Sequence, residues 1–224
     1  MIAPMCGRYT LHATPEGLSA TLDIPSAGFL EEPRYNIAPG QWVLVVRSEK
    51  GRSRVPLAAR WGLVPSWAKD PEAGPKPINA RAEGIASKPT FRGPLRHGRV
   101  LIPASGFYEW KQVGKAKVPH YIRPKGGGIF TFAGLMDTWQ SPDGSPLPTC
   151  TIITTTPNEL MADLHDRLPV ILDREGAAAW LDPETKPEPL LAPCPAEWME
   201  AWPVGPAVGN PRNEGPGLVE PCTM

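Results

Sequence analysis

Residues 99–111 read RVLIPASGFYEWK, and this stretch decides the fold class. It holds two runs, Arg99–Ile102 and Gly106–Lys111, that are rich in the β-branched and aromatic residues favoured in strands. Successive side chains of a strand point to opposite faces, so Glu109 lies on the face opposite to its two aromatic neighbours. The segment predicts two consecutive strands, the second of which carries a carboxylate among aromatic rings.

Runs of the same kind continue along the chain and outnumber the possible helices. The other expected strands are Trp42–Arg47, Val55–Trp61, His120–Arg123, Ile129–Asp137, Cys150–Thr155 and Leu168–Leu172. The expected helices are Pro15–Leu22, Asn79–Ser87, Pro157–Leu164, Arg174–Leu181 and Ala196–Trp202, with Asn79 and Thr156 as candidate N-caps. The strands follow one another without a βαβ rhythm, which predicts an α+β protein. Its antiparallel or mixed sheet would curl into a barrel-like core with short helices at the rim.

Composition excludes several classes of protein. Proline accounts for 30 of the 224 residues and is spread along the chain, which excludes long helices, coiled coils and helical bundles. The sequence has no run of about 18 apolar residues that could form a transmembrane helix, and no apolar segment of a secretory signal near residue 1. Residues 203–224 are rich in proline and glycine, so composition alone predicts a flexible tail.

The four cysteines contain no C-x-x-C pair, and together with the four histidines they show no zinc-ligand spacing. The sequence therefore predicts no metal, no cofactor and a reducing, cytoplasmic setting, at the nucleoid if the source is bacterial. The net charge is zero but unevenly placed, because residues 84–136 hold nine basic groups and one acid, Glu109. A basic centre is compatible with a nucleic acid or with an ordinary solvated surface.

Cys6 follows a methionine in the sequence Met-Cys-Gly-Arg-Tyr. If the chain starts at Met5 and that methionine is trimmed, Cys6 carries a thiol and an α-amine on adjacent carbons. The α-amine has a reference pKa near 8, so an appreciable fraction is neutral and nucleophilic at pH 7. Such a 1,2-aminothiol condenses with an aldehyde to an imine, which the thiol closes to a thiazolidine. The alternative is a small buried apolar residue.

Other candidate residues also have structural alternatives. Glu109 is either an outward-facing strand residue or a carboxyl poised for proton transfer. His165, in His-Asp-Arg-Leu-Pro, is either an acid or base near neutral pH or a surface histidine. Arg81 is a candidate phosphate ligand. Trp61 and Trp67, around a turn, are either core residues or a surface on which bases stack.

Seven segments together resemble one known family. They are Cys6–Tyr9, Tyr35–Pro39, Trp61–Trp67, Asn79–Glu83, Pro103–Trp110, His165–Pro169 and Asn210–Pro216. In this order they resemble the SOS response-associated peptidase (SRAP) family, and the resemblance runs from Cys6 to about Glu220. It implies one domain over residues 6–224 with a β-rich α+β fold, and it implies that the C-terminus packs on the body.

The resemblance also implies a function. Members of the family recognise abasic sites in single-stranded DNA and link to them covalently through an N-terminal cysteine, which shields the lesion during the DNA damage response. The catalytic residues implied here are Cys6, Asn79, Glu109 and His165. The implied DNA-binding residues are Arg8, Arg81 and Thr154 for phosphates, and Trp61, Trp67 and Pro39 beside the lesion. The partner would be single-stranded DNA with abasic sites, bound by a monomer away from membranes and without metal.

The sequence departs from the family at its start, since residues 1–5 precede Cys6 and leave it an amide nitrogen. Three explanations stay open: synthesis starts at Met5, the extension is cut off, or this member lacks the activity. We expect the active form to lack residues 1–5. Two other functions remain as alternatives. One is a thiol peptidase or autopeptidase, of the hydrolase class, that uses Cys6 and His165; the other is a non-covalent binder of modified or single-stranded DNA.

Overall fold

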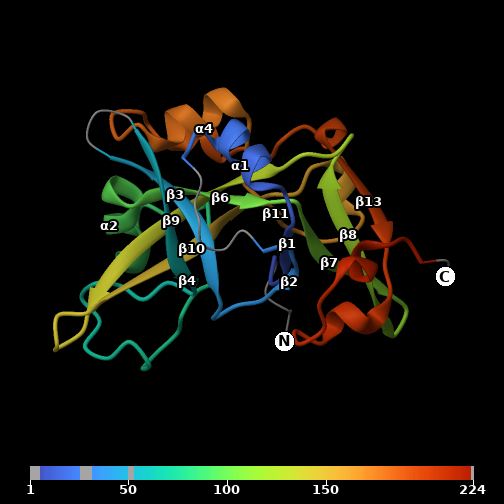
Figure 1. Ribbon diagram of the computed structural model, residues 1–224, viewed down its shortest axis with the longest axis horizontal. Coiled ribbons are helices and arrows are strands. Elements are labelled where there is room, and N and C mark those ends of the chain that lie inside the picture. The colour runs from blue at the N-terminus through green and yellow to red at the C-terminus, as the bar shows by residue number, and fades with distance from the viewer. Residues whose placement is uncertain (1–5, 26–31, 50–52, 223–224) are drawn as a thin grey trace.

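The computed structural model describes residues 6–25, 32–49 and 53–222, and two sheets form its body (Figure 1). The larger sheet contains a closed ring of five strands: β3 (Trp42–Ser48), β4 (Arg54–Trp61), β6 (Arg99–Ala104), β9 (Phe130–Gln140) and β10 (Pro146–Thr155). Four of the ring's pairings are antiparallel, and the parallel pairing of β10 with β4 closes it. The expected mixed, barrel-like core is confirmed.

Three short strands extend this sheet beside the ring. β5 (Asn79–Arg81) pairs in parallel with β10, β11 (Leu168–Pro169) pairs with the same strand, and β12 (Ile171–Leu172) pairs with β9. Thr154 of β10 lies between the two short strands, because it pairs with Arg81 of β5 and with Pro169 of β11. These pairings bring the Asn79 and His165 segments to the same end of the barrel.

The second sheet is antiparallel throughout. Its order is β13 (Met199–Pro203), β8 (Ala116–Pro124), β7 (Gly106–Val113), β1 (Tyr9–Leu11) and β2 (Arg34–Ile37). The chain passes from β6 in the barrel to β7 in this sheet through Ser105. Both strands predicted within residues 99–111 therefore form. Only glycine fits at position 106, because a Cβ there would lie 2.4 Å from the ring of Tyr121.

The helices are short and peripheral. They are α1 (Pro15–Leu22), α2 (Pro89–His97), α3 (Glu159–Ala162) and α4 (Arg174–Leu181), with 3-10 turns at Glu188–Leu191, Ala196–Trp198, Pro206–Gly209 and Pro216–Val219. The predictions of α1 and α4 are confirmed. The helix expected over Pro157–Leu164 is shorter, and its N-cap is Asn158, which accepts from Met161 N, rather than Thr156. Among the described residues, no helix is long and apolar enough to span a bilayer.

Two helix predictions are wrong. The segment expected to be a helix over Asn79–Ser87 begins as strand β5, so Asn79 caps no helix. The segment pairs with β10 instead: the Ile78 carbonyl accepts from β10 at 3.0 Å, and the Ala82 nitrogen donates to β10 at 2.8 Å. The helix expected over Ala196–Trp202 becomes strand β13 after one 3-10 turn, since β8 offers a free edge there.

Composition is also misleading at the C-terminus. Residues 203–222 do not form a flexible tail: Val204, Val208 and Leu218 are buried in a small core with Tyr108 and Tyr121. In Figure 1 this C-terminal segment, in red, lies against the second sheet. A few apolar side chains are enough to fix a segment rich in proline, because proline has little conformational entropy to lose.

Candidate active site

Cys6 and Glu109 meet where β1 and β7 run side by side. The Cys6 nitrogen donates a hydrogen bond of 2.6 Å to Glu109 Oε1, and both residues are buried. The register explains the meeting: Tyr9 pairs with Phe107, so the residues just before β1 lie along the residues that follow Phe107. Cys6 has a φ of 46°, in a left-handed region that residues other than glycine rarely adopt. Strain of this kind is found most often at functional sites.

Burial changes the acidity of both groups. Burial raises the pKa of Glu109 to about 8, although the N–H groups of Cys6 and Trp110 oppose the shift. Burial, and then the nearby Glu109, raise the pKa of the Cys6 thiol well above its usual range. The carboxyl can therefore gain or lose a proton near neutral pH, whereas the thiol stays protonated.

The shift at Glu109 predicts a pH-dependent stability. The folded carboxyl binds its proton more tightly than the unfolded one, so the free energy of unfolding falls as pH rises from about 5 to about 8. Glu109→Gln does not titrate, so it should gain stability relative to the wild type over this range, by on the order of 4 kcal/mol. Urea denaturation of both proteins at pH 5 and pH 8 measures the difference. Glu200→Gln, on β13, serves as the control, and an equal difference at both pH values would contradict the prediction.

His165 follows α3 in a tight turn. Its Nδ1 accepts the Arg167 N–H at 3.1 Å and lies 2.9 Å from Asp166 Oδ1. Burial lowers the pKa of His165, and Asp166 opposes this shift. Nδ1 can accept from the Arg167 nitrogen when the hydrogen of the neutral ring is on Nε2, and it can donate to Asp166 when the ring is protonated. Asp166 also raises the pKa of Glu109, which places the His165 turn in the electrostatic neighbourhood of the Cys6–Glu109 pair.

Arg167 joins the site's segments, and sequence reasoning missed it. Its guanidinium donates to both carboxylate oxygens of Glu83, at 2.6 and 2.7 Å, and to the carbonyl of Thr154 at 2.7 Å. It thus ties the His165 turn to β10 and to the segment that follows β5. The signal was present, because Glu83 and Arg167 both lie within the family segments, but neither was assigned a role.

Asn79, predicted to be catalytic, and the residues predicted to bind phosphates have different surroundings. Asn79 is half-buried and Arg81 is exposed on β5, while Thr154 is buried on β10. Arg8 is half-buried, and its guanidinium donates to Asn36 Oδ1, the Val208 carbonyl and the Gly209 carbonyl. Arg8 therefore fastens the C-terminal segment beside Cys6.

The two tryptophans predicted to lie beside the lesion differ in exposure. Trp61 lies in the core, 1% exposed, where its Nε1 donates to the Ile78 carbonyl and its ring contacts Tyr9. Trp67 is 66% exposed, and Pro39 is exposed on the turn after β2. Trp61 therefore supports the β5 segment from within, and Trp67 alone of the two is presented to solvent.

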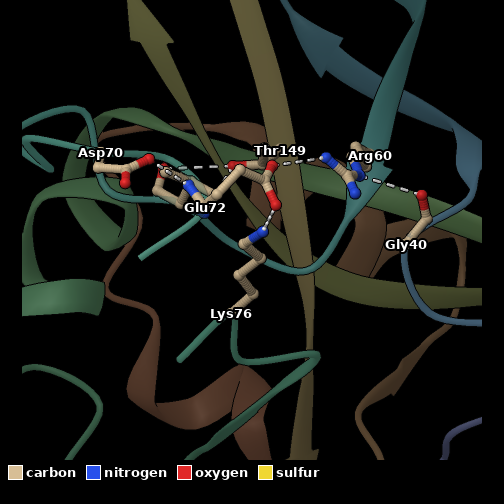
Figure 2. Close-up of polar contacts among 7 residues, drawn as sticks. Gly40, Arg60, Asp70, Glu72, Lys76 and Thr149 are labelled. Carbon is tan, nitrogen blue, oxygen red and sulfur yellow. Dashed lines mark hydrogen bonds and ion pairs between the residues drawn. The ribbon is translucent and has the colours of Figure 1, made fainter. Parts of the chain in front are cut away.

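An ion-pair network connects the Pro39 turn with residues 62–78, the loop between β4 and β5. Glu72 binds Arg60 of β4 at 3.3 Å and Lys76 at 2.5 Å (Figure 2). Arg60 Nε also donates to the Gly40 carbonyl at 3.1 Å, and Asp70 accepts from Glu72 N. Exposed pairs of this kind add little to stability. They do set the position of the 62–78 loop relative to the turn.

Among the described residues, no group of three His, Cys, Asp or Glu side chains could hold a metal ion. The fold and the site define a β-rich α+β protein in which a buried carboxyl holds the nitrogen of a cysteine. The sequence matches the SOS response associated peptidase (SRAP) family over residues 5–211, and the chain belongs to that family.

Relatives of known name agree with this assignment. The chain is 47% identical to abasic site processing protein YoqW of Bacillus subtilis (strain 168), over 96% of this chain and 99% of that one. It is 34% identical to abasic site processing protein YedK of Escherichia coli (strain K12), over 97% of this chain and 100% of the relative. A crystal structure of a Bacteroides thetaiotaomicron protein superposes with a TM-score of 0.87 at 26% identity, covering 97% of this chain and 100% of that chain.

Proposed function

We propose that this protein processes abasic sites in DNA by forming a thiazolidine crosslink to them through Cys6 as the N-terminal residue. The observation that carries the proposal is the 2.6 Å hydrogen bond from the Cys6 nitrogen to a buried carboxyl, Glu109. The names of the relatives support the choice of lesion. Exposed Arg81 and Trp67 support an unpaired strand as the substrate, because guanidinium and indole groups suit phosphates and unstacked bases.

The reaction balances without an oxidant or a metal. The neutral α-amine adds to the aldehyde of the open deoxyribose, and loss of one water molecule gives an imine. The thiol then adds across the C=N bond, its proton passes to nitrogen, and a five-membered thiazolidine closes. One aldehyde and one aminothiol give one crosslink and one water molecule.

The site residues suit the proton transfers that this sequence needs. Glu109, a buried carboxyl 2.6 Å from the Cys6 nitrogen, takes a proton from the amine and delivers one to the departing water. His165 moves a proton at the ring oxygen, which opens the closed sugar to its aldehyde. Asn79 orients the amine or the sugar oxygen, and Thr154 with the two arginines holds the neighbouring phosphates.

The chemistry requires a free α-amine on Cys6. Residues 1–5 lie outside the described residues, and we propose that the active form lacks them. A thiol peptidase fits the site less well. Burial raises the pKa of the Cys6 thiol and so disfavours the thiolate, whereas nucleophilic thiolates are found in electropositive surroundings. Self-cleavage at Cys6 remains a second candidate, since Glu109 holds the nitrogen that would leave.

The test compares two preparations whose N-termini are established by intact mass, one starting at Cys6 and one retaining residues 1–5. Each is mixed with single-stranded DNA that bears one abasic site, heated, and run on a denaturing gel. We expect a shifted band only from the chain that starts at Cys6, and none with undamaged DNA. No shifted band from that chain would refute the covalent function and leave a non-covalent DNA binder.

A further inference from the structure

The exposed Trp67 occupies a corner that is fixed on both sides. The Ala68 nitrogen donates to the Pro65 carbonyl at 2.9 Å, which closes a four-residue turn around Ser66 and Trp67. The turn lies within the 62–78 loop, which contains no strand or helix. A loop of this kind is normally mobile unless other groups satisfy its backbone.

Strands β9 and β10 supply those groups. Thr149 Oγ1 accepts from the Val64 nitrogen at 2.8 Å. Asp137 Oδ2 accepts from the Ser66 nitrogen at 2.8 Å, and Trp139 Nε1 donates to the Ala68 carbonyl at 2.7 Å.

The register explains why the three side chains act together. Asp137 pairs with Thr149 across β9 and β10, and Trp139 is two residues further along β9, so the three share one face of the sheet. They bind alternate residues of the loop, at positions 64, 66 and 68. The Trp67 side chain, between two of these contacts, is left 66% exposed.

We infer that Asp137 and Trp139 are positioning residues that hold the Trp67 indole ready to stack on an unpaired base beside the lesion. This inference rests on the proposed function for its substrate. A side chain presented by a fixed turn loses little conformational entropy when it binds, so pre-ordering strengthens binding without adding a contact. Among the described residues, the Asp137 carboxylate accepts hydrogen bonds from the backbone nitrogens of Ser66 and Thr138.

The inference predicts that replacing Asp137 weakens the binding of DNA, whereas simple electrostatics predicts that it strengthens the binding. Removing a negative charge near DNA should strengthen binding, because the phosphates are negative. We expect Asp137→Ala instead to weaken binding of undamaged single-stranded DNA roughly 3- to 10-fold, against roughly 10-fold for Trp67→Ala. Asp143→Asn, in the turn that joins β9 and β10, removes a charge from the same hairpin and is the control; it should bind as the wild type does or slightly better.

Three further variants distinguish a positioning role of Asp137 from a general loss of folded structure. Asp137→Asn keeps one acceptor oxygen for Ser66 and should lie between the wild type and the alanine variant. Trp139→Phe keeps the buried ring but loses the N–H to Ala68, and it should weaken binding similarly even if Asp137→Ala folds poorly. Asp137→Ala added to Trp67→Ala should weaken binding no further, because the carboxylate acts through the indole.

The same variants are then used in the crosslinking assay. The half-saturating concentration of abasic DNA should rise with Asp137→Ala, while the rate at saturation stays that of the wild type. Unchanged or tighter binding, or an equal loss in the Trp67→Ala background, would overturn the inference. Binding to undamaged DNA does not involve Cys6 chemistry, so a wild type that fails to crosslink but shows the Asp137–Trp67 coupling would refute the proposed function and leave this inference standing.

Discussion

Protein that begins at Cys6 and carries Cys6→Ala should form no heat-stable adduct with abasic single-stranded DNA. The variant keeps the α-amine and so still forms an imine, but it lacks the thiol that closes the ring. The imine hydrolyses on heating, so the crosslinked fraction should fall to the background of undamaged DNA. Borohydride reduces an imine to a stable amine, and it should restore a band for this variant. The measurement is the shifted fraction on a denaturing gel with and without borohydride.

Cys222→Ala is the matched control, because Cys222 is half-buried in the C-terminal segment, where its nitrogen donates to the Pro203 carbonyl. It should crosslink as the wild type does. A heat-stable band from Cys6→Ala without borohydride would show that another group forms the bond, and the thiazolidine would have to be abandoned.

Glu109→Gln should slow crosslinking by roughly 100-fold or more, which is the usual contribution of a positioned acid or base. Glutamine retains an oxygen that can accept from the Cys6 nitrogen, so the geometry of the pair is preserved while proton transfer is lost. The wild-type rate should depend on pH through the coupled titration of the Cys6 α-amine and Glu109, because the nitrogen and Oε1 lie 2.6 Å apart. The variant should lose the carboxyl's part of this titration. Single-turnover rates at several pH values measure both effects.

The control is again Glu200→Gln, because the Glu200 carboxylate pairs with Arg123 on β8, outside the site. Its rate should match the wild type. A wild-type rate in Glu109→Gln, with the pH profile retained, would remove Glu109 from the mechanism and direct attention to His165.

Local sequence predicted the long strands well, but it predicted neither the short strands β1, β2, β5 and β13 nor which strands pair. The run from Arg99 to Lys111 is rich in β-branched and aromatic residues, and both of its strands form. Asn79–Arg81 carries no such signal. It becomes a strand through its pairing with β10, some 70 residues later in the chain. Helix α2 was missed because Pro89 and Pro94 argue against a helix. Pro89 occupies the first turn, and Pro94 is tolerated in a short helix that buries its ring.

The residues of the site could likewise be predicted one by one, but their contacts could not. Glu109 could be singled out as the one acid of a basic, apolar region, and Cys6 by its position after a methionine. Their contact could not be predicted, since it depends on the register of β1 against β7, across about 100 residues of sequence. The residue types do not distinguish Trp61 from Trp67 either. Only the fold makes one a core residue and the other a surface residue.

The contacts of Arg8 and Asn36 join an early part of the chain to a segment that is synthesised much later. Arg8 is held by the carbonyls of Val208 and Gly209, and Asn36 donates to those of Asn210 and Asn213. The ribosome synthesises Cys6 and Glu109 before residues 208–213, so a nascent chain that stops short of these residues would carry Cys6 and Glu109 without the contacts beside them. Under the proposed function, the ability to capture a lesion should therefore appear only once residues 208–213 have been synthesised and have packed against Arg8 and Asn36.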